Sequence, residues 1–188
     1  IIAAGYGVEQ IRDFFSKKDT SYEVIISVEG EPLGTGGAVG LASKNLTKEG
    51  PVLVLNGDLI SSIDVKALLS HHYDKGAKAT LSLWEVENPS RFGVCDLDDN
   101  GLIRRFQERP EPGTEFSNYS NAGCVRIEKE ILYNFSSERH SMERVVFPPI
   151  AEAGQMAGLV FSGYFVDAGT PLSFIEAAQV CIDNNRFN

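Results

Sequence analysis

The stretch that decides the fold is GPVLVLNGD, residues 50–58, in which four aliphatic residues are followed abruptly by Asn56, Gly57 and Asp58. A short, unbroken aliphatic run of this kind predicts a strand that is buried on both faces, as in a parallel sheet. Its polar end places Asp58 at the carboxyl end of that strand. Because ligands of open α/β sheets bind beyond the carboxyl ends of the strands, the same stretch predicts where a site lies.

Upstream of this run, strand-like and helical patterns alternate. Residues 1–5 (IIAAG) and 21–29 (SYEVIISVE) predict two strands, and a helix between them places Val8, Ile11, Phe14 and Phe15 on one face. The glycine-rich loop EPLGTGGAV, residues 31–39, follows, and the residues after it have helical spacing.

Downstream, residues 64–76 predict a helix with Asp64 as N-cap and Gly76 at its end. We expect the buried stripe of this helix to consist of Val65, Leu68, Leu69 and Tyr73. Residues 78–86 (KATLSLWEV) then alternate between apolar and polar, as in a strand.

The second half of the chain adds a hairpin to this alternation. Residues 92–108 form two strand-like runs joined through Asn100-Gly101, a dipeptide typical of tight hairpin turns. The remaining patterns predict a strand at 120–128, a short helix at 129–135, one strand within 158–169 and a last helix at 170–185 with Thr170 as N-cap. The sequence therefore predicts a Rossmann-like, doubly wound α/β domain with a mixed sheet and a β-hairpin insertion, in three α/β/α layers.

Composition narrows the choice of partners. The 188 residues carry a formal net charge of −9 with only 17 Lys and Arg, which argues against nucleic acid as a partner. No apolar run approaches the roughly 20 residues that cross a bilayer. Three scattered cysteines without a CxxC pair indicate reduced thiols, so we expect a cytoplasmic protein.

Two aspartates follow predicted strands. Asp58 ends the aliphatic run and Asp167 ends GYFV. Two such side chains from separate strands could share one divalent cation, with phosphate oxygens and water as further ligands. The alternative is structural: Asp58 would cap a helix and Asp167 would start a turn.

Other polar residues form weaker signals. Glu108 and Arg109 end the hairpin; a carboxylate suits sugar hydroxyls and a guanidinium suits phosphate. In a regular strand their side chains would point to opposite faces, and such a pair is more often a solvated edge. Asn121 and Gly123 could contact a ligand or form a turn. Neither a metal-binding histidine pattern nor a nucleophile with its base is evident.

Five motifs in order, EPLGTGGAV, VLNGD, FGVCDLDDNGLIRRFQERP, SNAGCVRI and GYFVDAGTP, resemble the sugar-1-phosphate nucleotidylyltransferases. The likeness covers essentially the whole chain, and EPLGTGGA is most similar to enzymes that use GTP with mannose 1-phosphate or a manno-heptose 1-phosphate. The resemblance implies the nucleotide-diphospho-sugar transferase fold. It also implies attack by the sugar phosphate on the α-phosphorus of a nucleoside triphosphate, with loss of pyrophosphate.

In that family a G-G-x-G-T-R loop after the first strand binds the phosphates, and this motif does not occur in residues 1–188. We therefore expect residues 1–188 to form a single nucleotidylyltransferase domain that begins at the second strand of the fold, without the first strand and its phosphate loop. By resemblance, the glycine-rich loop lies against the nucleotide base. Glu29 or Glu31 could accept hydrogen bonds from N1–H and the amine of guanine, whereas uracil or thymine would suit a glutamine better.

The resemblance also implies a role for each matching residue. Asp58 and Asp167 would hold Mg²⁺, and Arg109, where the family usually has lysine, would bind the sugar phosphate; these three are the predicted catalytic residues. The remaining contacts fall into two groups. The nucleotide would be bound by Glu29, Glu31, Leu33, Gly34, Thr35 and Gly57, and the sugar by Gly93, Glu108, Asn121 and Gly123.

Several alternatives stay open. The same reaction could use UTP, CTP or dTTP with another sugar phosphate, or the chain could be a silent homologue that binds a nucleotide sugar and regulates a partner. A glycosyltransferase would normally show a D-x-D motif, which NGD is not. The sequence leaves open which sugar is used and whether copies of the chain form a homo-oligomer.

Overall fold

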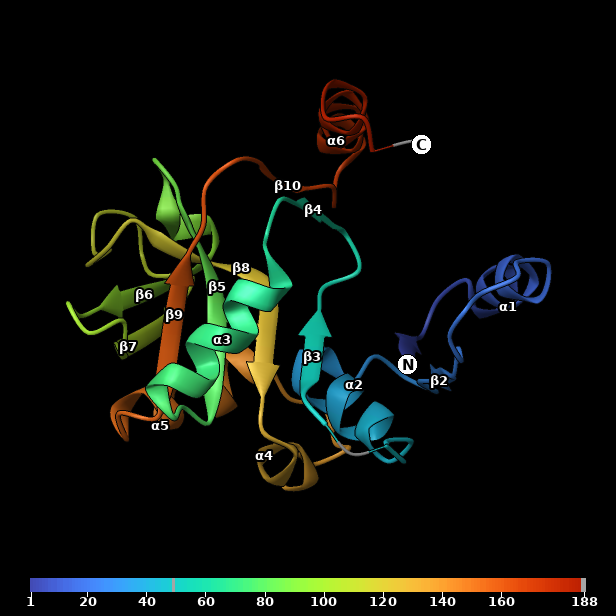
Figure 1. The fold of residues 1–188 in the computed structure, drawn as a ribbon, viewed down its shortest axis with the longest axis horizontal. Coiled ribbons are helices and arrows are strands. Elements are labelled where there is room, and N and C mark those ends of the chain that lie inside the picture. Colours follow the sequence, from blue (N-terminus) through green and yellow to red (C-terminus); the bar gives the residue numbers. More distant parts are fainter. Residues whose placement is uncertain (49, 187–188) are drawn as a thin grey trace.

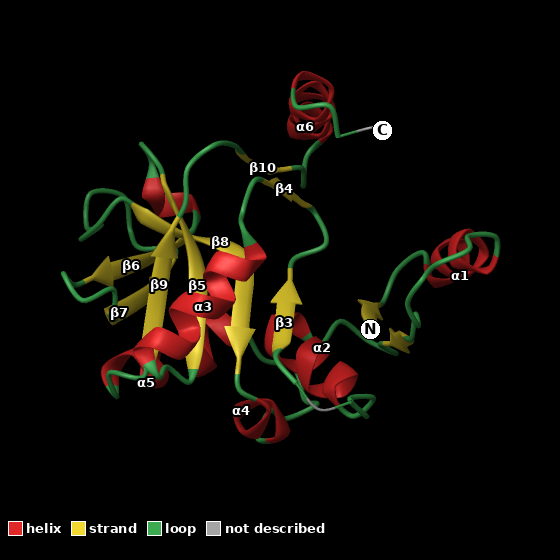
Figure 2. Cartoon of the chain, viewed as in Figure 1, coloured by secondary structure: helices red, strands yellow, loops and turns green. Residues whose placement is uncertain are grey.

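The structure of the protein is a computed structural model that describes residues 1–48 and 50–186. A mixed six-stranded sheet forms its centre (Figures 1 and 2). The strand order is β7–β6–β8–β5–β9, and β3 pairs with β8 as well. The six strands are β3 (Val52–Leu55), β5 (Ala79–Glu85), β6 (Gly93–Leu97), β7 (Ile103–Glu108), β8 (Tyr119–Ile127) and β9 (Met156–Val160). Only β5 and β9 are parallel neighbours; the other pairs of this sheet are antiparallel.

Helices cover both faces of this sheet, which confirms the three-layer prediction. Helix α3 (Val65–Lys75) lies on one face, where its His72 contacts Thr80 of β5. On the other face, Leu81 and Leu83 of β5 belong to the same core cluster as Phe147. That layer is built from η2 (Met142–Val146, a π-helical turn) and α5 (Phe147–Glu152), beside α4 (Lys129–Tyr133) and α2 (Gly34–Ser43).

The strand with two buried faces is not the one that the sequence indicates. β3 is only partly buried, Leu55 is 58% exposed, and β3 pairs antiparallel with β8 at one end of the sheet. The strand within 78–86, β5, is instead buried on both faces, because Thr80 and Ser82 satisfy their hydroxyls inside the protein. The prediction of two buried faces was therefore wrong for β3, and the apolar–polar alternation of β5 reflects buried hydrogen bonds rather than exposure to solvent.

Two small sheets flank the central one (Figure 1). β1 (Ile2–Ala4) pairs in parallel with β2 (Ile26–Val28), and β4 (Leu59–Ser61) pairs antiparallel with β10 (Phe165–Asp167). The single strand expected within 158–169 is thus two strands, β9 and β10. The part of the chain that the structure describes holds three further helical segments: α1 (Val8–Ser16), η1 (Pro89–Arg91) and α6 (Pro171–Asp183).

Local capping signals are confirmed. Asp64 accepts hydrogen bonds from the N–H groups of Lys66 and Ala67, and Gly76 ends α3 in a left-handed conformation. Thr170 forms a capping box with Ser173 at the start of α6. The hairpin turns at Gly101, with φ of 77°. No helix among residues 1–48 and 50–186 is long and apolar enough to span a bilayer.

The buried side of α3 differs from the predicted stripe. Tyr73 is 59% exposed, whereas Leu68 and His72, four residues apart, are fully covered. His72 Nδ1 lies 2.8 Å from Thr80 Oγ1, and its Nε2 lies 3.1 Å from Glu128 Oε1. Burial lowers the pKa of His72 more than its hydrogen bond to Glu128 raises it. A neutral ring that donates from Nε2 and accepts from Thr80 fits this network.

We expect this histidine to make the fold sensitive to acid. Since the folded-state pKa of His72 lies below its ordinary value of 6.5, stability is present above pH 6.5 and falls as the pH drops toward the folded pKa. Urea unfolding between pH 7.5 and pH 5 should show this loss, with a slope of at most about 1.4 kcal/mol per pH unit. His72→Gln should flatten the slope and His140→Gln should not; equal slopes in both variants would contradict the assignment.

Candidate functional site

Two carboxylates meet where β3 and β10 end. The backbone N–H of Ala168 donates to the carbonyl of Asp58 at 2.8 Å, which holds the two chain segments together. A Cβ built on Gly169 would lie 2.9 Å from Oδ1 of Asp167 and 3.6 Å from Oδ2 of Asp58. Both aspartates are exposed. The structure therefore brings together the predicted acidic pair, and glycine at 169 leaves room between the two side chains.

This acidic pair opens into a cavity of about 670 Å³. Trp84, Phe92 and Phe165 form an aromatic wall, with ring centroids of Phe165 lying 6.1 Å from Trp84 and 6.3 Å from Phe92. Arg91 also lines the cavity, as does the first turn of α6. The cavity thus combines three carboxylates (Asp58, Asp167 and Glu176), one guanidinium and apolar rings, a mixture that suits a polar ligand with a flat or apolar part.

The middle of β8 lies beside this acidic edge. Along one side of β8, Val94 of β6 pairs with Ser120, while β3 pairs with residues 124–127. Between these partners Gly123 adopts φ of 68°, and a β-bulge interrupts the pairing of β8 with β5. A side chain at 123 would collide with Leu59 and approach Asn56 to 2.9 Å. Gly123 is thus required for the close approach of β3, in addition to any ligand contact.

Glu108 and Arg109 stand at the end of β7, opposite Gly93 of β6. The strand stops at Glu108, and Arg109 takes φ of 46°, so the two side chains do not point to opposite faces as a regular strand predicts. Arg109 Nε lies 3.3 Å from Glu108 Oε1, with the arginine 68% and the glutamate 17% exposed. Glu108 Oε2 lies 2.9 Å from where a Cβ on Gly93 would be.

The carboxylate of Glu108 is held in an unfavourable environment for its charge. Burial raises its pKa most, and the nearby carboxylate of Glu143 raises it further, while Arg109 and Arg144 lower it in part. Perturbed carboxylates of this kind occur preferentially at functional sites. Glu143 and Arg144 were not predicted from the sequence. The signal that could have found them is the stretch SMER, residues 141–144. Its Ser141 caps the π-helical turn by accepting a hydrogen bond from the N–H of Arg144, and its Oγ donates to Glu143 at 2.7 Å.

Glu143 links this cluster to the glycine-rich segment. Thr35 Oγ1 donates to Glu143 Oε2 at 2.5 Å and accepts from the N–H of Met142 at 2.9 Å. Through Glu143, the predicted nucleotide-binding residue Thr35 is therefore placed beside the predicted sugar-binding residue Glu108.

The glycines of this segment belong to a helix and pack against the protein itself. α2 begins at Gly34, so residues 34–39 of the expected loop 31–39 are helical. Side chains at Gly36, Gly37 and Gly40 would collide with the segment 136–140, and the N–H of Gly36 donates to the carbonyl of His140. These three glycines are explained by that packing, whereas Gly34, with φ of 69°, permits the entry into the helix.

The two glutamates predicted to face a base differ in their surroundings. Glu29 Oε2 accepts a hydrogen bond of 2.9 Å from the N–H of Leu33, while Glu31 is exposed. Among the described residues, no hydrogen bond or ion pair joins either of them to Asp58 or Asp167. Gly57 has open space around it.

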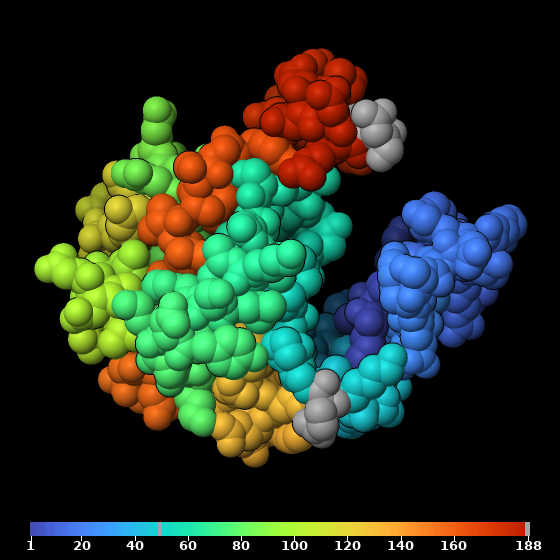
Figure 3. Space-filling model, viewed as in Figure 1, coloured from blue at the N-terminus to red at the C-terminus, as the bar shows by residue number. Residues whose placement is uncertain are grey.

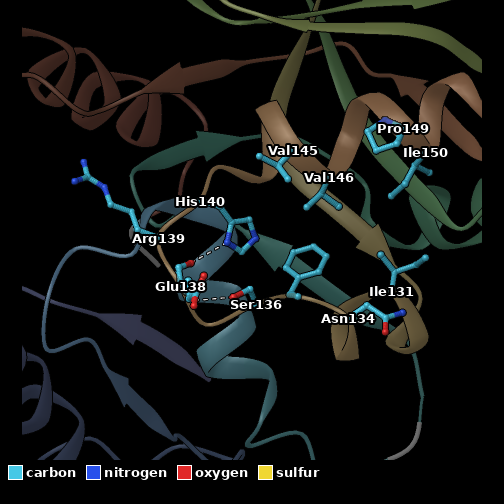
Figure 4. Close-up of a pocket in the computed structure, with 11 residues that line it drawn as sticks. Ile131, Asn134, Ser136, Glu138, Arg139, His140, Val145, Val146, Pro149 and Ile150 are labelled. Atoms are coloured by element: carbon cyan, nitrogen blue, oxygen red, sulfur yellow. Dashed lines mark hydrogen bonds between the residues drawn. The ribbon is translucent and has the colours of Figure 1, made fainter.

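A separate cavity of about 470 Å³ lies beside the segment 136–140, which packs against the glycines of α2 (Figure 4). It is lined by residues 131–150, and its labelled side chains include His140, Arg139 and Val146. His140 Nδ1 bonds to the carbonyl of Glu138 at 2.9 Å. None of the predicted site residues lines this cavity, so it is not part of the candidate site.

The family described as Nucleotidyl transferase matches residues 3–184. The chain therefore belongs to the nucleotidyl transferase family.

Within this family, the chain is similar to proteins named as mannose-1-phosphate guanylyltransferases. The chain is 34% identical, over 99% of its length and 51% of the relative's, to the mannose-1-phosphate guanylyltransferase catalytic subunit beta of Drosophila melanogaster. It is 32% identical, over 99% of its length and 52% of the relative's, to mannose-1-phosphate guanylyltransferase 1 of Arabidopsis thaliana. It thus spans about half the length of these curated relatives.

Among solved structures, HddC from Yersinia pseudotuberculosis complexed with GMP-PN superposes with a TM-score of 0.76 at 26% identity, covering 94% of this chain and 76% of that one. This likeness confirms the predicted fold.

We expect Glu108→Gln to stabilise the fold at neutral pH. The folded-state pKa of Glu108 is raised, so its favourable contribution exists below its ordinary pKa of 4.5 and is lost as the pH rises through the folded pKa. At pH 7 the variant should melt about 1–3 °C higher, and the difference should vanish below pH 4. Glu111→Gln, an exposed matched control, should show no such pH-dependent gain. A lower melting temperature for Glu108→Gln at pH 7 would contradict this account.

Proposed function

We propose that the protein transfers a guanylyl group from GTP to a manno-configured sugar 1-phosphate, giving a GDP-sugar and pyrophosphate. The observation that carries this proposal is the convergence of Asp58 and Asp167 over Gly169 in a cavity of about 670 Å³. Family membership, and relatives named as mannose-1-phosphate guanylyltransferases, support the reaction and the choice of base.

The acidic pair has the donor set that Mg²⁺ prefers. Asp58 and Asp167 offer hard carboxylate oxygens on two different segments, with cavity space in front of them. Among the residues that the structure describes, no group of three or more His, Cys, Asp or Glu side chains forms a closed metal cage. Two carboxylates fit a cation that takes its other ligands from phosphates and water. When bound, Mg²⁺ would neutralise charge on the reacting phosphates.

The sugar 1-phosphate would lie between the hairpin and β8. Glu108 would accept hydrogen bonds from sugar hydroxyls, and Gly93 would allow the ring to approach the backbone of β6. Asn121 and Gly123 would contact the sugar from β8. Arg109, whose side chain is 68% exposed and, among the described residues, paired only with Glu108 at 3.3 Å, would turn to the phosphate with its fork of donors.

The guanine base would lie at the start of α2. Between the two candidate acceptors, the structure favours Glu31, because a carboxylate oxygen of Glu29 is already bonded to the N–H of Leu33. Leu33, Gly34 and Thr35 would contact the nucleotide at the entry to the helix. Gly57, with open space around it, would lie against the nucleotide from the other side.

The chemistry needs positioning more than a protein nucleophile. An oxygen of the sugar phosphate attacks the α-phosphorus of GTP in line, a new P–O bond forms, and the bond to pyrophosphate breaks. Arg109 and Arg91 would hold negatively charged oxygens, and the acidic pair would hold the cation; orientation of the two substrates supplies much of the rate. In a chain with a net charge of −9, this local positive charge is what makes binding of two anions feasible.

We infer further that residues 1–188 act as one domain, that the protein works in the cytoplasm, and that nucleic acid is not a partner. The net charge and the three unpaired cysteines support the last two points.

The reaction is tested by pyrophosphate release from the full-length protein with Mg²⁺. We expect GTP to be preferred over UTP, CTP and dTTP, and mannose or manno-heptose 1-phosphate over glucose 1-phosphate. Preference for another nucleotide would overturn the assignment of Glu31 but keep the reaction. Absence of release with every pair would favour a silent homologue that binds nucleotide sugars.

The acidic pair is tested by Asp58→Asn, which removes charge with little change in shape. We expect the turnover number to fall by about 100-fold or more, with an unchanged melting temperature. Asp64→Asn is the matched control, because Asp64 only caps α3 and asparagine caps helices equally well. Near-full activity of Asp58→Asn would place the cation elsewhere.

A further inference from the structure

The hydroxyl of Thr35 is turned into the protein. Its Oγ1 donates to Glu143 Oε2 at 2.5 Å and accepts from the N–H of Met142 at 2.9 Å. Because a hydroxyl has a single donor, this one has no donor left for a nucleotide. The side chain of a residue in the glycine-rich stretch is thus engaged with η2, the segment that carries Glu143.

Glu143 is fixed at one carboxylate oxygen and open at the other. Ser141 Oγ donates to the same Oε2 at 2.7 Å, so two hydroxyls, those of Thr35 and Ser141, set the direction of this carboxylate. Within residues 1–48 and 50–186, Oε1 accepts no hydrogen bond and the carboxylate forms no ion pair. A partly buried carboxylate oxygen without a donor is available to a ligand.

Glu143 also lies near Glu108. η2 packs against both α2 and β7, and β7 ends at Glu108. Burial raises the pKa of the Glu108 carboxyl most, and the negative charge of Glu143 raises it further. Two carboxylates in such a place repel each other, and hydroxyl donors placed between them relieve that repulsion. A sugar carries hydroxyls on neighbouring carbons, so it can supply donors to both carboxylates at once.

The start of α2 stays in place without help from the hydroxyl of Thr35. One side of α2 borders the hollow that Figure 3 shows between the N-terminal segment, in blue, and the body of the molecule; Val39 and Ala42 line it. The first residues of the helix are held by backbone hydrogen bonds: His140 N–H donates to Leu33 at 2.9 Å, and Gly36 N–H donates to His140 at 3.0 Å. A side-chain change at position 35 removes neither bond.

We propose that Glu143 accepts hydrogen bonds from hydroxyls of the sugar 1-phosphate, beside Glu108, and that Thr35 is a positioning residue that aims Glu143. This inference rests on the proposed guanylyl transfer and adds to it a second acceptor for the sugar. The nucleotide would meet the backbone of Thr35, while its hydroxyl serves the sugar. A sugar that lacks a hydroxyl at either carboxylate would leave a charge unpaired, so the pair selects substrates with both hydroxyls free.

The test measures the two substrates separately in the full-length protein with Mg²⁺. Pyrophosphate release gives kcat/KM for the preferred sugar 1-phosphate at saturating GTP, and calorimetry gives the dissociation constant of GTP alone. Thr35→Val keeps the shape but removes the hydroxyl. We expect kcat/KM for the sugar 1-phosphate to fall about tenfold, as for a lost hydrogen bond to a charged group, and GTP affinity to stay within about twofold. Thr35→Ser keeps the hydroxyl and should restore the original kcat/KM.

A second variant separates this role from a loss of structure. Thr35→Val leaves the N–H of Met142 without its acceptor, whereas Glu143→Gln keeps that hydrogen bond and removes only the charge. Glu143→Gln should cause the same fall of about tenfold with unchanged GTP affinity. The double variant should lose about tenfold and not about 100-fold, because both changes act through one carboxylate. The matched control is Glu138→Gln, an exposed carboxylate that lines the separate cavity; it should alter neither quantity.

The inference and the proposed reaction fail on different results. Weaker GTP binding by Thr35→Val with an unchanged kcat/KM for the sugar 1-phosphate would overturn the inference, because the hydroxyl would then serve the nucleotide. Multiplied losses in the double variant, or no recovery with Thr35→Ser, would overturn it as well. If the unchanged protein releases no pyrophosphate with any pair of substrates, the guanylyl transfer itself fails, and the assignment of Glu143 to a sugar falls with it.

Discussion

Backbone pairing along β8 is the constraint on which the rest of the structure depends. This strand pairs with β5 along one edge and is shared between β6 and β3 along the other. The change of partner requires Gly123, whose left-handed φ and missing side chain let β3 approach. A strand that served only one partner would leave the hairpin or β3 without a place in the sheet.

The position of the candidate site follows from the sharing of one edge of β8 between β6 and β3. β3 delivers Asp58 to the place where β10 delivers Asp167, and the hairpin delivers Glu108 and Arg109. Each acidic residue thus comes from a different segment, and the pairing of strands, not local sequence, sets their spacing. The link from Thr35 to Glu143 ties the start of α2 to the same cluster.

The parts of the fold and of the candidate site that depend on local sequence signals could be predicted. The caps at Asp64 and Thr170 and the turn at Gly101 depend on neighbouring residues alone, and they are confirmed. A cation site shared by Asp58 and Asp167 was predicted from their places at strand ends, but the structure brings them together by another route: β4, which follows Asp58, pairs antiparallel with β10, so that Leu59 lies opposite Asp167. The burial of β5 could not be predicted, since Thr80 and Ser82 find partners only in the folded protein. Glu143 was missed for the same reason: its importance lies in contacts to Thr35 and Glu108, which are distant in the chain.

Because of the packing of α2, its glycines indicate an intact fold and not by themselves a nucleotide-binding site. Gly36, Gly37 and Gly40 are needed because the segment 136–140 lies against them. Selection on folding alone would preserve them, even in a descendant that no longer handled nucleotides. A search among related sequences for members that keep the proposed activity should therefore weigh the carboxylates at 58 and 167 above the glycine signature: the glycines report an intact scaffold, whereas the carboxylates belong to the proposed cation site.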